Sequence, residues 1–85
     1  MEKIVRIKLK QELMSKVKGN ISVHSVDDTL IIDIQLENEN KFHYTINTLS
    51  AKISAGLSSK IIADIVVKKY KAFILSQHFY EKIYW

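Results

Sequence analysis

The chain has 85 residues, no cysteine and a formal net charge of +4. This length corresponds to one domain, residues 1–85, and the lack of cysteine excludes disulfides, thiolate metal sites and thiol nucleophiles. No segment reaches the ~18 consecutive apolar residues of a membrane span, and residues 1–18 lack the unbroken hydrophobic run of a signal peptide. We therefore expect a soluble cytoplasmic protein.

Residues 2–18 fit two patterns. Ile4, Val5, Leu9, Leu13, Met14 and Val17 approximate helical spacing, and Gly19-Asn20 is a suitable helix stop. Residues 3–10 also alternate partly between charged and apolar types, as a strand would, but Ile4 breaks that alternation. We favour a helix over residues 2–18.

Three β-prone runs follow, over residues 21–26, 30–36 and 42–46. Asp27-Asp28 forms a tight turn between the first two runs, because short carboxylate side chains bond nearby backbone amides. The alternation predicts an antiparallel meander with one apolar face, and such a sheet needs helices across that face. The predicted apolar face consists of Leu30, Ile32, Ile34, Leu36, Phe42, Tyr44 and Ile46.

Two helices complete the predicted architecture. Asn47 or Thr48 caps a short helix that carries Leu49 and Ile53, closed by Gly56, and residues 58–85 then form a long amphipathic helix capped by Ser58 or Ser59. The predicted apolar arc of the long helix includes Ile61, Ile62, Ile65, Val66, Tyr70, Ala72 and Phe73. The fold class is α+β, a two-layer α-β-β-β-α-α domain with a three-stranded antiparallel meander packed on helices.

Some apolar residues of the long helix fall outside this arc. Val67, Ile74 and Trp85 lie together on the other side, Leu75 falls within the polar stripe, and residues 79–85 are unusually aromatic for a chain end. Either the short helix covers this strip, or the strip binds a partner or a second copy of the chain. We predict an apolar partner or dimer strip formed by Val67, Ile74, Tyr84 and Trp85, in a homodimer with Ile74, Tyr84 and Trp85 at or near the interface.

Charge is segregated along the chain, with basic residues near both ends and acidic residues between them. This pattern is typical of solvated faces that keep a protein soluble, or of surfaces that bind charged partners. The candidate partner-binding acidic hairpin carries Asp27, Asp28, Asp33, Glu37 and Glu39, and the candidate basic stripe of the long helix consists of Lys60, Lys68, Lys71 and Lys82.

No catalytic constellation is visible in the sequence. His24, His43 and His78 show no metal-ligand or triad spacing, and the two isolated glycines form no phosphate-binding loop. Asp27-Asp28 fits a turn better than a metal pair. We expect no enzymatic activity, no cofactor and no metal.

Two nucleic-acid-binding families share features with the chain. The predicted topology resembles that of the double-stranded RNA-binding domain. The family's lysine-rich helix, which contacts phosphates, is similar to Lys68-Lys69-Tyr70-Lys71-Ala72. However, those lysines lie three turns into the helix, and the acidic Asp27-Asp28 stands where the family has a glycine-proline-histidine loop. Residues 51–65 resemble a helix-turn-helix with Gly56 at the turn, although Lys52 stands where a small residue is expected. Either resemblance implies direct nucleic-acid binding.

As a whole, the lysine-rich, proline-free chain resembles small early proteins of phages that infect Gram-positive bacteria, some of which are anti-CRISPR inhibitors with this topology. This resemblance implies a protein in the cytoplasm of a bacterial host. Our leading hypothesis is a non-enzymatic binding protein that docks on and inhibits or modulates a nucleic-acid-handling protein, such as a CRISPR effector nuclease. The alternative is a direct double-stranded RNA- or DNA-binding module that uses its basic helices; neither hypothesis involves a membrane.

Overall fold

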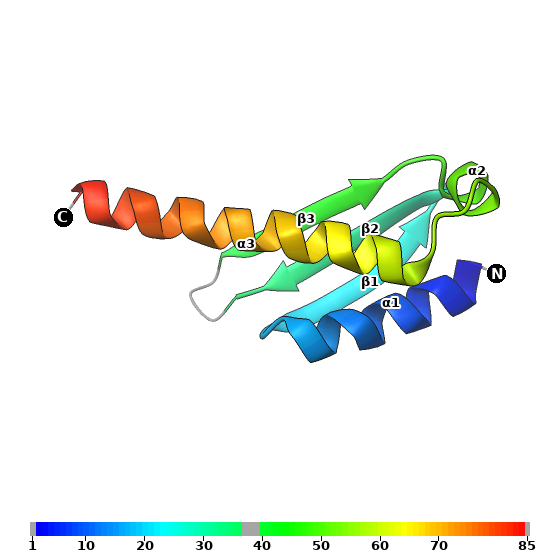
Figure 1. Cartoon of the computed structure of the whole chain (residues 1–85), viewed down its shortest axis with the longest axis horizontal. Helices are drawn as coiled ribbons and strands as arrows, with labels where there is room; N and C mark the ends of the chain where they lie inside the picture. The colour runs from blue at the N-terminus through cyan, green and yellow to red at the C-terminus, as the bar shows by residue number, and fades with distance from the viewer. Residues whose placement is uncertain (1, 37–39, 85) are drawn as a thin grey trace.

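The fold is built on a three-stranded antiparallel sheet formed by β1 (Asn20–Val26), β2 (Thr29–Gln35) and β3 (Lys41–Ile46), in the order β1-β2-β3 (Figure 1). The computed structural model describes residues 2–36 and 40–84, and the side chains of residues 3–36 and 40–76. This sheet is the predicted meander.

The register of the sheet places most apolar residues of its strands on one face, with Val26 and Ile31 on the other. Ile34 on the central strand pairs with Ile21 on one side and with Phe42 on the other. Leu30, Ile32 and Ile34 have no exposed surface, as their strict alternation predicts. The opposite face is polar, and its exposed residues include Ser22, His24, Lys41, His43 and Thr45.

Two helices cover the apolar face. Helix α1 (Glu2–Lys16) packs on β1 and beside the long helix α3 (Ser59–Tyr84), and these two helices run in the same direction (Figure 1). The short helix α2 (Leu49–Ser54) lies at one end of the sheet. The fold is therefore the predicted two-layer α-β-β-β-α-α arrangement. Its core consists of Leu9, Leu13, Ile21, Leu30, Ile32, Ile34, Phe42, Ile46, Leu49, Ile62, Ala63, Val66 and Tyr70.

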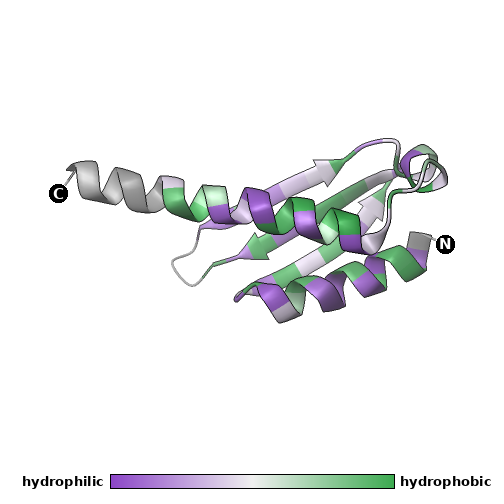
Figure 2. Ribbon diagram, in the orientation of Figure 1, coloured by the Kyte–Doolittle hydropathy of each residue, from purple (hydrophilic) through white to green (hydrophobic). Residues whose placement is uncertain are grey.

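Helix α3 begins where its sequence predicts, but its buried face is rotated. The hydroxyl of Ser58 accepts a hydrogen bond from the backbone N–H of Ile61 at 3.3 Å, as an N-cap does. Ile61 was expected in the core but is 46% exposed, whereas Ala63 is fully buried. The reason is that α3 packs against α1 as well as the sheet, which turns its apolar arc toward α1. Figure 2 shows the resulting mixture of apolar and polar residues along both long helices.

The start of α2 is held by a distant residue instead of the predicted local cap. Thr48 precedes α2 in a left-handed conformation, and its side chain makes no capping bond. The β1–β2 turn supplies the acceptors: the carbonyl oxygen of Asp28 accepts from the N–H of Leu49 at 2.9 Å, and its Oδ1 accepts from the N–H of Ser50 at 2.9 Å. Thr48 is therefore the N-cap residue, as one of the two predicted positions, but the capping hydrogen bonds come from Asp28 instead of its own side chain.

Gly19 allows α1 to turn into β1 at close range. Its φ is +137°, and a Cβ at this position would lie 2.8 Å from the carbonyl oxygen of Gln35. Only glycine combines this backbone conformation with such a close approach. The glycine that the sequence predicts as a helix stop is therefore also required for the close approach of the chain to Gln35.

Candidate functional site

The difference in length between α1 and α3 leaves part of α3 uncovered. Helix α1 has 15 residues and α3 has 26, so at 1.5 Å per residue they span about 22 and 39 Å. The helices lie side by side, but α1 ends at Lys16 and α3 continues past it and past the sheet (Figure 1). Beyond Lys16, the side of α3 that faced α1 has no helix beside it among the described residues.

A groove of about 380 Å³ occupies this position. We name it the α1–α3 groove, and it is lined by Lys16, Val17, Lys18, Val67, Tyr70, Lys71, Ile74 and Leu75. Its apolar side chains come from Val17, just beyond the end of α1, and from α3, and three lysines share the lining with them. Apolar surface bounded by charged side chains is typical of sites that bind another macromolecule.

The apolar residues of the groove are only partly covered. Tyr70 is 9% exposed, and Val17, Val67 and Ile74 are half-buried against the core. Leu75 is 69% exposed, the largest value among the exposed large hydrophobic residues of the described chain. The groove thus keeps apolar surface in contact with water, and covering that surface would be favourable.

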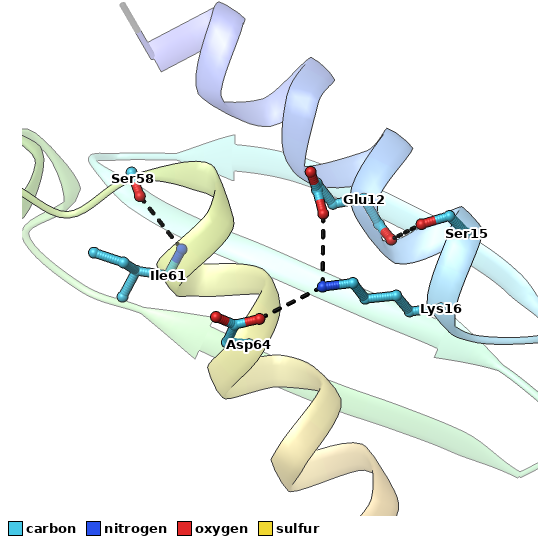
Figure 3. A network of polar contacts seen from close by, with 6 residues as sticks. All are labelled: Glu12, Ser15, Lys16, Ser58, Ile61 and Asp64. Atoms are coloured by element: carbon cyan, nitrogen blue, oxygen red, sulfur yellow. Dashed lines mark hydrogen bonds and ion pairs between the residues drawn. The ribbon is translucent and has the colours of Figure 1, made fainter.

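The lysines around the groove differ in their pairing. Nζ of Lys16 lies 3.5 Å from Oδ1 of Asp64 and 3.7 Å from Oε2 of Glu12, so it links the end of α1 to α3 (Figure 3). Among the residues that the structure describes, Lys18 and Lys71 have no ion-pair partner. The groove therefore carries two uncompensated positive charges and a third that two carboxylates share.

Tyr70 brings a polar group to this apolar site. Its ring packs edge-on against Phe42, with 5.7 Å between the ring centroids. Burial raises the pKa of the Tyr70 phenol above its ordinary value, because loss of water disfavours the phenolate. The hydroxyl of Tyr70 has no hydrogen-bond partner within the described part of the chain, so it can donate a hydrogen bond to a bound group.

The groove collects part of the predicted apolar strip. Val67 and Ile74 of that strip come together in it, beside Leu75 from the polar stripe, while Tyr84 and Trp85 lie outside the residues whose side chains are described. The neighbouring element is α1, and not the short helix that the sequence had suggested as the cover. The homodimer with Ile74, Tyr84 and Trp85 at its interface stays a prediction.

The groove also contains four residues that were not predicted for a binding site: Lys16, Val17, Lys18 and Tyr70. A signal was present: a helix that stops before Gly19 is much shorter than one that starts at Ser58, so the first cannot cover the whole length of the second. The sequence pattern did not indicate that these two helices pack beside each other.

The basic stripe is only partly gathered in one place. Lys60, Lys68 and Lys71 are all exposed on α3, but the exposed carboxylate of Asp64 also lies on this side of the helix. Lys71 alone among them belongs to the groove. The side chain of Lys82 lies outside the described residues.

The acidic hairpin divides between separate environments. Asp27 and Asp28 form the β1–β2 turn, where Asp28 holds α2, whereas Asp33 lies on the polar face of the sheet. There Oδ1 of Asp33 lies 2.5 Å from Nδ1 of His43, and Oδ2 lies 4.0 Å from Nζ of Lys41. Glu37 and Glu39 lie outside the described residues. Among the described residues, the acidic side chains therefore do not form one continuous patch.

The described part of the chain also contains no cluster of metal-ligand residues and no membrane-spanning helix. No group of three or more histidine or acidic residues there could hold a metal ion. None of the helices in that part combines the length and apolarity needed to cross a membrane. His24, Asp33 and Lys41 line a shallow polar depression on the open face of the sheet, but Asp33 already contacts His43 and Lys41.

Comparison with protein-family models, with curated proteins and with solved structures finds no match to this chain.

Proposed function

We propose that this chain is a non-enzymatic binding protein that docks on another protein through the α1–α3 groove. The observation that carries the proposal is the combination, in one groove, of exposed apolar side chains and unpaired lysines. Protein interfaces combine an apolar centre with polar groups at the rim, and the groove is lined by both kinds of side chain, with Ile74 and Leu75 among the apolar ones and Lys18 and Lys71 among the charged ones.

The distribution of exposed apolar residues also favours protein binding through the helical layer of the fold. Within the described residues, the large hydrophobic side chains that remain exposed lie mostly on the two long helices: Ile4, Ile7, Met14, Ile61 and Leu75, with Val26 at the end of β1 as the exception. The open face of the sheet is mainly polar. The helical layer is therefore the better candidate for a protein-binding surface.

The class of partner follows from the sequence resemblance alone. A nucleic-acid-handling protein, with a CRISPR effector nuclease as the most concrete form, stays our proposed target, and so does a phage or mobile-element origin. Neither the groove nor the comparisons bear on that narrower identity.

Direct nucleic-acid binding is the second candidate function, favoured by the exposed Lys60, Lys68 and Lys71 on α3. Affinity based on phosphate contacts decreases steeply with salt, because counterions are released on binding. A mobility-shift assay at low and moderate salt tests this alternative. Salt-sensitive duplex binding that is lost on reversing Lys60 and Lys68 would favour it.

Photo-crosslinking tests the main proposal. A benzophenone amino acid replaces Leu75 in the groove, and a matched variant carries it at Thr45, which is exposed on the open face of the sheet. Both variants are irradiated in nuclease-treated lysate of the cells that encode the protein. We expect a discrete protein adduct from position 75 only. Adducts from position 45 alone, or none from either position, would contradict docking through the groove.

A further inference from the structure

We infer that the occupant of the α1–α3 groove is an acidic amphipathic helix of the partner protein, with apolar residues along one stripe and carboxylates beside it. This inference rests on the proposed function and names the chemistry of its ligand.

The geometry of α3 favours a helix as the occupant. Val67 and Ile74 are seven residues apart, two turns of α3, or about 10.5 Å along its axis. A bound helix presents apolar residues at the same repeat, because positions i, i+3 or i+4, and i+7 share one face. Helix α1 already packs in this way upstream, where its buried Leu9 and Leu13 are four residues apart. A partner helix would continue that packing beyond Val17.

The charge of the groove favours acidic side chains on that helix. Lys18 and Lys71 are exposed and lack ion-pair partners among the described residues, whereas Lys16 already contacts Glu12 and Asp64. Carboxylates beside the apolar stripe would meet Lys18 and Lys71 without displacing an internal pair. The hydroxyl of Tyr70 offers one further donor.

The same charge argues against a second copy of this chain as the occupant. Both long helices are basic: α1 contains Lys3, Arg6, Lys8, Lys10 and Lys16 against two glutamates, and α3 contains Lys60, Lys68, Lys69, Lys71 and Lys82 against one aspartate and one glutamate. Docking either helix of another copy would bring like charges together. The acidic Asp28 is engaged in capping α2 and belongs to a turn, not to a helix.

Fluorescence anisotropy with designed peptides tests the inference. The acidic probe is a labelled helix with leucines at i, i+4, i+7 and i+11 and glutamates at the flanking positions, and the matched probe has lysine at every glutamate position. We expect the acidic probe to bind more tightly than the basic probe and to weaken with added salt. Leu75→Ser should weaken its binding without opening the core, because Leu75 is 69% exposed.

Charge-reversal variants locate the contact. Lys18→Glu with Lys71→Glu should weaken binding of the acidic probe about 10-fold, because the reversal removes two exposed ion pairs and adds repulsion between like charges. Lys10→Glu with Lys52→Glu changes the net charge equally at exposed sites that do not line the groove, and should have about 2-fold effect or less.

Each contrary result has a separate meaning. Equal affinity for the acidic and basic probes would overturn the inference that the occupant is an acidic helix, and so would an equal loss of affinity with the two pairs of variants. Neither result would contradict docking through the groove. If position 75 gives a crosslink but the acidic probe does not bind, the inference of an acidic helix is also overturned while docking through the groove is retained. Failure of the crosslink as well would end the proposed function. A dimer in light scattering that Leu75→Ser converts to a monomer would assign the groove to a second copy and overturn the inference.

Discussion

Asp28 and Ser50 are 22 residues apart in the chain and are joined by two hydrogen bonds: Oδ1 of Asp28 accepts from the backbone N–H of Ser50 at 2.9 Å and from its hydroxyl at 2.6 Å. The turn of the β1–β2 hairpin thus takes the place of an N-cap for α2. Because α2 has only six residues, it depends on such contacts more than a longer helix would.

Replacement of Asp28 by Ala removes this cap. We expect Asp28→Ala to lower the free energy of unfolding by about 1–2 kcal/mol, the range for loss of a capping side chain. Asp27→Ala is the matched control, because Asp27 has a similar positive φ in the same turn and its side chain does not cap α2. Urea denaturation measures both variants, and equal losses would show that the carboxylate of Asp28 does not stabilise α2.

The two glycines provide a test of the close packing between α1 and the sheet. Both have positive φ, but a Cβ at Gly19 would meet the carbonyl oxygen of Gln35 at 2.8 Å, whereas nothing lies within 4 Å of a Cβ at Gly56. Each alanine substitution adds backbone strain of about 1–3 kcal/mol. Gly19→Ala should therefore destabilise the protein more than Gly56→Ala in thermal melts, and the reverse order would disprove the close approach at Gly19.

Core residues of α3 should differ in their effects. Ile62 is fully buried, while Phe73 is only half-buried and contacts Phe42 with 5.6 Å between ring centroids. Ile62→Ala should reduce the free energy of unfolding by about 2–5 kcal/mol, and Phe73→Ala should reduce it less than truncation of a fully buried phenylalanine. A larger loss from Phe73→Ala than from Ile62→Ala in chemical denaturation would contradict the orientation of α3.

The raised pKa of Tyr70 gives the stability a pH dependence at alkaline pH. The folded state binds the phenolic proton more tightly than the unfolded state. The resulting contribution to the free energy of unfolding is complete below the unfolded pKa of about 10, and it is lost as the pH rises through the pKa of the folded state. Tyr70→Phe removes the titrating group. Denaturation between pH 8 and 11 should therefore show a steeper decline for the wild type than for Tyr70→Phe, and parallel declines would count against this account.

Local patterns predicted the elements of the fold well. The strict alternation of Leu30, Ile32 and Ile34 identifies a half-buried strand, and a serine at position 58 before an apolar run identifies the start of α3. These signals act within a few residues, so they remain valid whatever the rest of the chain does.

Contacts between distant segments were not predictable in the same way. An amphipathic arc indicates that a face is buried but not which element covers it, so the burial of Ala63 and the pairing of α1 with α3 were missed. The capping of α2 by Asp28 was missed because the expected cap was local to Thr48. The groove depends on the same long-range pairing, which is why Tyr70 and its residues at and just beyond the end of α1 were not anticipated.

The measurement that tests the groove most directly is a titration of ¹⁵N-labelled protein with the acidic amphipathic peptide, followed by amide chemical shifts. Binding in the α1–α3 groove should shift the amides of Val17, Val67, Ile74 and Leu75 and leave Ser22, His43 and Thr45 on the open sheet face unchanged. Shifts confined to the sheet face, or a spectrum unchanged at high peptide concentration, would contradict the groove as the binding site for an acidic helix.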